Sequence, residues 1–100
     1  MEKLLSVCGF TAEKNFDEDG SIILCLNEIE FLIETGKDED EALTNMAKAI
    51  LEYAGDYYSD LAFWSRGRNT KGHMQYVMKA LALNDVEKIK DLIKCQPGEI

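Results

Sequence analysis

The sequence predicts an α+β fold, a three-stranded antiparallel sheet packed by one long amphipathic helix and followed by two shorter C-terminal helices. Apolar, partly β-branched runs with two turn signals occupy the first third of the chain. Helical periodicity then extends over residues 38–61 and returns in shorter segments after residue 72. These observations give the element order β-β-β-α with a helical extension.

The predicted strands are residues 4–16, 21–26 and 29–34. Residues 17–20, Asp-Glu-Asp-Gly, form the first turn, because glycine supplies the positive φ that such turns require. Residues 27–28, Asn-Glu, offer a second tight turn. We therefore expect two consecutive hairpins.

The third predicted strand alternates with period two, which is typical of a half-buried strand. One set is Ile29, Phe31 and Ile33, and the set on the outer face is Glu30, Leu32 and Glu34. In the second strand both faces are apolar, so Ile23 and Cys25 need cover from later helices or from a second molecule. This excess of apolar side chains in the second strand predicts a homo-oligomer, with a dimer favoured.

The long helix begins after Asp38, which has capping-box spacing to Glu41. Its apolar stripe faces the sheet and consists of Leu43, Met46, Ala47, Ile50, Ala54, Tyr57 and Leu61. Residues 65–72 are a predicted polar loop, and residues 73–83 a second helix. A third helix begins at Asn84 or Asp85, with Asn84 and Glu87 at capping-box spacing, and Pro97-Gly98 stops it.

The 100 residues are predicted to form a single domain, residues 1–100, with an acidic hairpin-helix unit (1–64) and a mildly basic helical extension (65–100). The formal charge of −8 is unevenly distributed: residues 1–65 carry 4 Lys against 15 acidic residues, and residues 66–100 carry 7 Lys and Arg against 4. An acidic front half repels phosphates and attracts basic proteins. A basic protein partner therefore fits best.

Several function classes are disfavoured. The start of the chain is too polar for a signal peptide and no apolar run could span a bilayer, so we expect a cytoplasmic protein without membrane association. The three widely spaced cysteines suggest neither disulfides nor zinc. His73, the one histidine, has no nucleophile or carboxylate partner at a suggestive spacing. We predict no catalysis, no cofactor and no metal site.

Two groups of residues near the end of the long helix are binding candidates. Tyr57 and Trp64 belong to an aromatic run that is core in part and an interface anchor in part. Arg66, Arg68 and Lys71 are weaker candidates for nucleic-acid contact, since the basic residues of this region also suit docking on the acidic front half.

Residues 16–54 resemble HicB-like antitoxins, through Asp17-Glu18-Asp19-Gly20-Ser21 and through residues 35–43, Thr-Gly-Lys-Asp-Glu-Asp-Glu-Ala-Leu. The resemblance implies a dimerising β-β-β-α unit without catalytic residues that blocks a small basic ribonuclease toxin by covering its active site. It also implies operator DNA as a ligand of the C-terminal region. By position, the partner-binding residues would be Glu30, Leu32, Glu34, Tyr57 and Trp64.

The alternative hypothesis is a self-associating structural or regulatory domain with no toxin partner. The surplus apolar residues of the second strand favour it as well. A neighbouring reading frame for a small basic protein would separate the two hypotheses. A small enzyme or metal protein ranks last, because one histidine without a ligand cluster leaves few ways to build a site.

Overall fold

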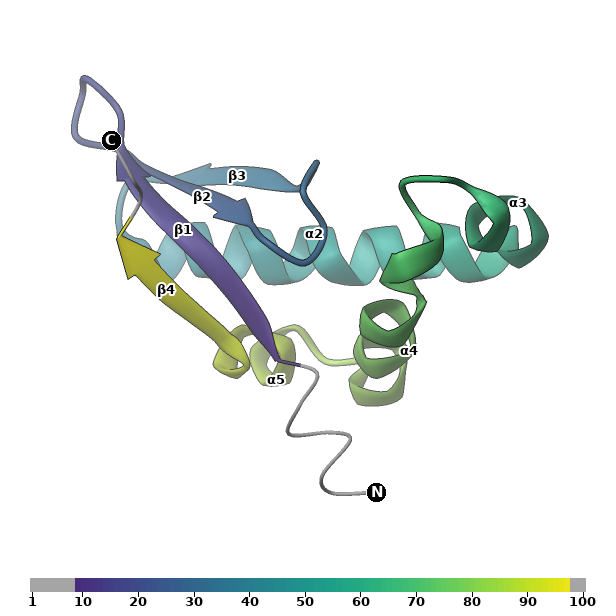
Figure 1. Ribbon diagram of the computed structural model, residues 1–100. Coiled ribbons are helices and arrows are strands. Elements are labelled where there is room, and N and C mark those ends of the chain that lie inside the picture. Colours follow the sequence, from purple (N-terminus) through teal and green to yellow (C-terminus); the bar gives the residue numbers. More distant parts are fainter. Residues whose placement is uncertain (1–8, 98–100) are drawn as a thin grey trace.

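The computed structural model describes residues 9–97 and has an α+β fold with one sheet (Figure 1). The strands are β1 (Phe10–Phe16), β2 (Ile22–Leu26), β3 (Ile33–Gly36) and β4 (Ile93–Pro97). The helices are α2 (Glu39–Ser59), α3 (Leu61–Arg66), α4 (Met74–Leu83) and α5 (Val86–Asp91), with a 3-10 turn η1 (Lys71–His73) before α4. The α+β class and the order of the first four elements are confirmed.

The β1–β2 hairpin forms where the acidic turn predicted it. Gly20 has a φ of 89°, a conformation that glycine adopts without steric cost. The Asp17 N–H donates to the Ser21 carbonyl at 2.8 Å, and the Ser21 N–H donates to the Asp19 carboxylate at 2.9 Å. The first predicted strand is shorter than expected, since β1 starts at Phe10, and the predicted residues 4–8 lie outside the described part.

The third strand differs from its prediction, because β3 spans residues 33–36 and not 29–34. The Leu32 N–H donates to the Ile29 carbonyl at 3.0 Å and closes a turn. The Glu28 carboxylate accepts from the Thr11 N–H at 2.7 Å and fixes the start of that turn. Ile29 is fully buried there, so core burial and a side-chain hydrogen bond outweigh the alternating pattern.

Helix α2 starts as its capping signal predicts. The Asp38 carboxylate accepts from the Glu41 N–H at 2.8 Å, and the Glu41 carboxylate accepts in return from the Lys37 N–H at 3.2 Å. The buried side of the helix carries the apolar stripe Ala42, Met46, Ala47, Ile50, Tyr53, Ala54 and Tyr57. This stripe packs on the sheet and forms the main core.

The C-terminal region is more regular than predicted. Residues 61–66 form α3 and residues 71–73 form η1, where the sequence indicated the helix end and a polar loop. Asn84 ends α4 with a φ of 45°, and Asp85, rather than Asn84, caps α5 by accepting from the Lys88 N–H at 3.1 Å. None of the helices within residues 9–97 is long and apolar enough to span a membrane.

The second of the two predicted C-terminal helices, which was expected to run to Pro97, is wrong beyond Asp91, because residues 93–97 form strand β4 parallel to β1. The described sheet is therefore mixed and four-stranded, in the order β3-β2-β1-β4, and not antiparallel and three-stranded. The free edge of β1 supplies the physical reason. Its backbone groups need partners, and alternating Ile93 and Cys95 match Phe10 and Ala12 in register.

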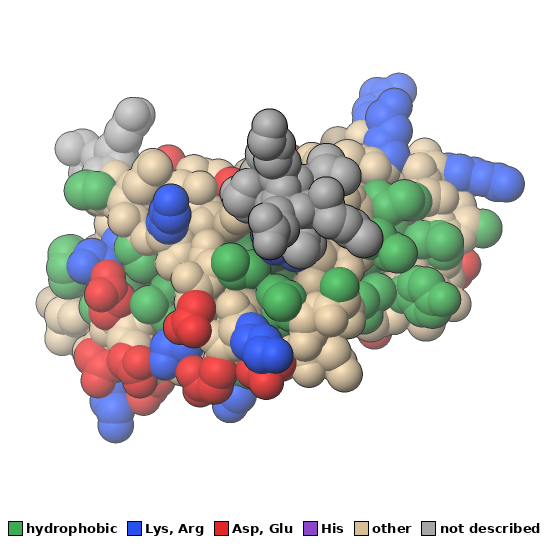
Figure 2. All heavy atoms as spheres, turned by 90° about the horizontal axis from the view of Figure 1, so that it is seen from below, with side chains coloured by type: hydrophobic (Ala, Val, Ile, Leu, Met, Phe, Trp, Pro, Cys, Tyr) green, Lys and Arg blue, Asp and Glu red, His purple; other side chains and the backbone are tan. Residues whose placement is uncertain are grey.

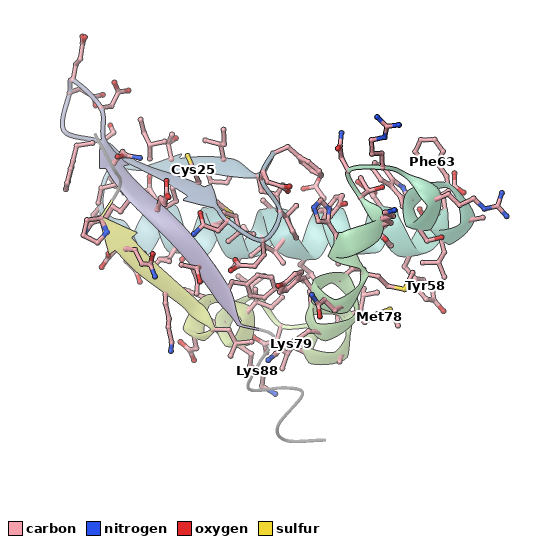
Figure 3. All side chains as sticks on the ribbon, in the orientation of Figure 1. Cys25, Tyr58, Phe63, Met78, Lys79 and Lys88 are labelled. Carbon is pink, nitrogen blue, oxygen red and sulfur yellow. The ribbon has the colours of Figure 1, made fainter. Side chains whose placement is uncertain are left out.

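The two faces of the sheet have different environments. Helix α2 covers one face of the sheet (Figure 1), where Ala12, Leu24 and Ile22 are buried. No helix of the described residues covers the other face, where Ile23 and Cys25 are partly exposed and Ile33 is 56% exposed. Figure 3 shows Cys25 pointing away from α2.

Candidate functional site

A groove of about 270 Å³ lies between β3 and the middle of α2. Its walls are Leu32 and Glu34 from the β3 side and Ala49, Glu52, Tyr53 and Asp56 from α2. The three acidic residues and Ala49 come from sequence positions that the core does not use. The groove thus combines an apolar floor with an acidic rim at the edge of the sheet.

The carboxylates of this groove lack internal compensation. No ion pair within residues 9–97 includes Glu34, Glu52 or Asp56. Three like charges around one open groove raise its negative potential, because the low-dielectric walls focus the field. A cationic group from another molecule would relieve this repulsion.

Tyr53, which lines the groove, belongs to a chain of hydrogen bonds with His73 and Glu30. His73 is 4% exposed, with Nδ1 2.8 Å from the Tyr53 hydroxyl and Nε2 3.1 Å from Glu30 Oε2. A carboxylate only accepts, so Nε2–H donates to Glu30, and Nδ1 accepts from the Tyr53 hydroxyl. The turn that carries Glu30 is thereby tied to α2 and η1.

Two titration properties reflect this arrangement. The backbone N–H of Glu30 itself and then the His73 hydrogen bond lower the pKa of the Glu30 carboxyl. Burial, followed by the nearby Tyr57 and Glu30, raises the pKa of Tyr53 to about 12. The Tyr53 hydroxyl therefore stays protonated and available as a donor.

An aromatic cluster supports the groove from below. The Tyr53 ring makes edge contacts with Phe31 at 5.0 Å and with Trp64 at 5.7 Å between ring centroids. Tyr57 is fully buried, stacks on Trp64 at 6.1 Å and donates to the Thr70 carbonyl at 3.0 Å. In this cluster Phe31 is the exposed member, at 51%.

The basic candidates lie at the α3 end of the molecule. Arg66, Arg68 and Lys71 are all exposed and remain close in sequence around the turn after α3. The exposed apolar residues Tyr58, Phe63 and Met78 project from the same end (Figure 3). In Figure 2 hydrophobic side chains gather at this end, whereas acidic and basic side chains are interspersed at the other.

A second groove, of about 310 Å³, lies at the opposite edge of the sheet. It is lined by Lys14, Phe16, Glu39, Cys95, Gln96 and Pro97. Here Lys14 Nζ lies 3.2 Å from Glu39 Oε1, so the charges are internally paired. Burial raises the pKa of the Cys95 thiol, which keeps it protonated and unreactive.

Two of the residues predicted from the sequence to bind a partner line the acidic groove. Leu32 and Glu34 line it, whereas Glu30 does not and bonds to His73 instead. Leu32 and Glu34 face the α2 side of the sheet and not the predicted outer face. The shortened β3 inverts the predicted alternation, because Glu34 pairs with buried Leu24 and Ile33 pairs with Cys25. Tyr57 lies beneath the surface, and Trp64 is partly exposed.

The sequence alone did not indicate Glu52 and Asp56 as groove residues, although their spacing of four places them on one helix face. It showed no local partner for His73, which the structure buries at the start of α4. Its partners Tyr53 and Glu30 are 20 and 43 residues away, so no local spacing could indicate them.

The described residues contain no group of three or more His, Cys, Asp or Glu placed to hold a metal ion. The residues that line the acidic groove include no serine, cysteine, histidine or lysine. Its shape and charge suit a basic side chain of another protein.

Comparisons with known proteins give two matches. A family model described as PHD-like, antitoxin of RelE/RelB toxin–antitoxin systems, matches residues 1–95. A crystal structure from Syntrophomonas wolfei subsp. wolfei, described as the antitoxin part of a proposed toxin/antitoxin system, is 27% identical with a TM-score of 0.84. That match covers 97% of this chain and 71% of the other. No curated protein sequence matches the chain.

Proposed function

The chain belongs to the PHD-like antitoxins of RelE/RelB toxin–antitoxin systems, and we propose that it neutralises a small basic toxin by binding it along the acidic groove between β3 and α2. One observation carries the proposal. Glu34, Glu52 and Asp56 surround the groove, and within residues 9–97 no cation pairs with them. A basic partner would supply the missing positive charge.

The mechanism that we propose is competition with nucleic acid. A ribonuclease holds phosphates with basic side chains, because phosphate contacts dominate its affinity for RNA. The carboxylates at the groove present a negative charge similar to that of the phosphates. Once the chain is docked on the toxin, it would keep RNA away from these basic side chains. The chain would then cover the toxin active site without catalytic residues of its own, which is the mode implied by the resemblance to HicB-like antitoxins.

The net charge of −8 contributes to the rate of this encounter. Opposite charges steer two proteins together, and salt screens the attraction over roughly 10 Å at 0.1 M ionic strength. The apolar parts of the groove, Leu32 and Ala49, would set the residence time once water is displaced. Added salt should therefore lower the association rate constant by a larger factor than it raises the dissociation rate constant.

The test is inhibition of RNA cleavage by the proposed partner, a small basic RelE-type toxin. We expect stoichiometric addition of the purified chain to abolish cleavage at low salt and to require higher concentration at 0.5 M salt. Cleavage that continues unchanged in a tenfold excess of the chain would contradict the proposal. Albumin, which is also acidic, serves as the control for charge alone.

Three further properties stay predictions of the same proposal. Ile23, Cys25 and Ile33 on the uncovered sheet face suit a homodimer contact. Arg66, Arg68 and Lys71 suit operator DNA. The chain is also predicted to act in the cytoplasm, where a toxin that cleaves RNA would meet its substrate.

A further inference from the structure

Strand β3 has one edge that no described strand covers, since it lies at the end of the sheet order. The Leu26 N–H donates to the Leu32 carbonyl at 3.0 Å, which fixes the phase of the β2–β3 ladder. In an antiparallel ladder, hydrogen-bonded and non-bonded residue pairs alternate. Opposite Leu24, Glu34 therefore bonds to β2, whereas the N–H and C=O groups of Ile33 and Thr35 point to the open edge.

The helix closes part of this edge. The Asn45 side-chain amide donates to the Thr35 carbonyl at 2.8 Å. This leaves the Ile33 N–H, the Ile33 carbonyl and the Thr35 N–H on the open side, with no partner among the hydrogen bonds of residues 9–97. Donor and acceptor groups in this order match one side of an added strand.

The acidic groove lies directly beside these groups. Glu34 comes from β3 itself, while Ala49, Glu52 and Asp56 recur at four and three on α2, continuing the helix face that starts with Asn45. A strand placed about 4.8 Å beyond β3 would turn every second side chain toward this helix face. Those side chains would meet the carboxylates.

We propose that the toxin adds an extended segment to the edge of β3 and inserts basic side chains, at alternate positions, into the acidic groove. This inference rests on the proposed function and assigns its mode of binding. Backbone hydrogen bonds to Ile33 and Thr35 supply the geometry, and Glu34, Glu52 and Asp56 select Lys or Arg.

Charge distinguishes a basic strand from a second copy of this chain. Two β3 edges brought together would place Glu34, Glu52 and Asp56 of each copy against the same residues of the other. Like charges placed opposite one another in a sheet are destabilising. The same carboxylates thus prevent self-pairing of an exposed edge and admit a basic partner.

The test compares two substitutions at one position, Thr35→Pro and Thr35→Val. Proline removes the outward N–H without breaking a bond to β2, and proline is tolerated at such edge positions. Valine keeps the N–H and the β-branched shape. Affinity for the proposed RelE-type toxin is measured by titration calorimetry, with circular dichroism as the check of folding.

We expect Thr35→Pro to weaken toxin binding about 10-fold or more, because the incoming carbonyl loses its donor, and Thr35→Val to stay within about twofold. Equal affinity of Thr35→Pro and wild type would overturn the strand addition and leave the proposed function intact. If the wild type does not bind, the proposed function fails and the inference fails with it.

Amide hydrogen exchange keeps the inference testable if Thr35→Pro unfolds. In the wild-type complex, the Ile33 and Thr35 amides should exchange at least about 10-fold more slowly than in the free chain. Unchanged exchange at both amides, with the toxin bound, would overturn the inference.

Discussion

The two edges of the sheet carry grooves of similar size, but the charges of one groove are paired within the chain and those of the other are not. At the β4 edge, the groove of about 310 Å³ contains Lys14 and Glu39, whose charged atoms are 3.2 Å apart. At the β3 edge, the groove of about 270 Å³ contains Glu34, Glu52 and Asp56, and no ion pair of residues 9–97 includes them. An internally paired site is complete in the free chain, whereas an unpaired one gains most from a partner.

The backbone at the two edges differs in the same way. Strand β4 ends in Pro97, which has no N–H to offer to an added strand. Strand β3 retains outward groups at Ile33 and Thr35, and only the Thr35 carbonyl is occupied, by Asn45. The difference indicates that binding capacity is concentrated at the β3 edge, although the sequence is acidic along most of its first half.

The largest effect is expected from charge reversal in the acidic groove. Glu52→Lys should weaken toxin binding about 100-fold, because a basic partner side chain would meet a like charge in a partly desolvated site. Affinity is measured by titration calorimetry. The matched control is Glu18→Lys in the exposed β1–β2 turn, which changes net charge equally and should alter affinity by less than about threefold. Equal effects of the two variants would show that only overall charge matters.

A second, smaller effect concerns the hydrogen bonds of His73 to Tyr53 and Glu30. His73→Ala should lower the free energy of unfolding by about 2 kcal/mol, because the buried Tyr53 hydroxyl loses its acceptor and a cavity forms. Urea unfolding measures it. Met78→Ala at an exposed site of α4 is the control and should change stability by about 0.5 kcal/mol or less. A His73→Ala variant as stable as that control would contradict this role.

Local signals in the sequence predicted the hairpin and α2, because their causes lie within a few residues. Asp38 and Glu41 cap the helix from three positions apart, and Gly20 serves the turn in which it stands. Strand β4 could not be predicted, because residues 93–97 become a strand only beside β1, some 80 residues earlier. The hydrogen bonds of His73 to Glu30 and Tyr53 could not be predicted either, because these residues are far apart in the sequence.

The acidic groove was half predictable. Glu34 and Leu32 stood out through alternation along the strand, although the turn before β3 reversed the face on which they lie. Glu52 and Asp56 have the composition of any solvated helix face. Only the position of the β3 edge above that face gives them a joint role.

A still smaller effect is expected at the β4 edge. Lys14→Met should change the free energy of unfolding by about 0.5 kcal/mol or less, because the Lys14–Glu39 pair is partly exposed to solvent and such pairs contribute little. Toxin affinity should stay within about twofold of wild type. Calorimetry and urea unfolding of the same sample measure both values. A tenfold loss of affinity would move the binding site toward this edge.

The smallest effect is the pH dependence of the Glu30 contact. The folded-state pKa of Glu30 lies below the ordinary glutamate value of 4.5, so the group stabilises the fold fully above pH 4.5 and loses this contribution as pH falls through the lower folded value. The stability difference between wild type and Glu30→Gln should therefore be constant above pH 4.5 and shrink in stronger acid. Urea unfolding of both proteins from about pH 5 to 3 measures this difference, because the Glu30 carboxyl is the one acid group that the two proteins do not share. A difference that grows in acid would contradict the assignment.

The central claim is that the toxin binds along the β3 edge and the adjacent face of α2. An amide chemical-shift map of the ¹⁵N-labelled chain, titrated with the unlabelled toxin that we propose as its partner, tests this most directly. We expect the largest shifts in residues 32–36 and 49–56, with those of residues 93–97 small. Shifts concentrated instead at residues 93–97, or around Arg66 to Lys71, with the groove unaffected, would contradict the account.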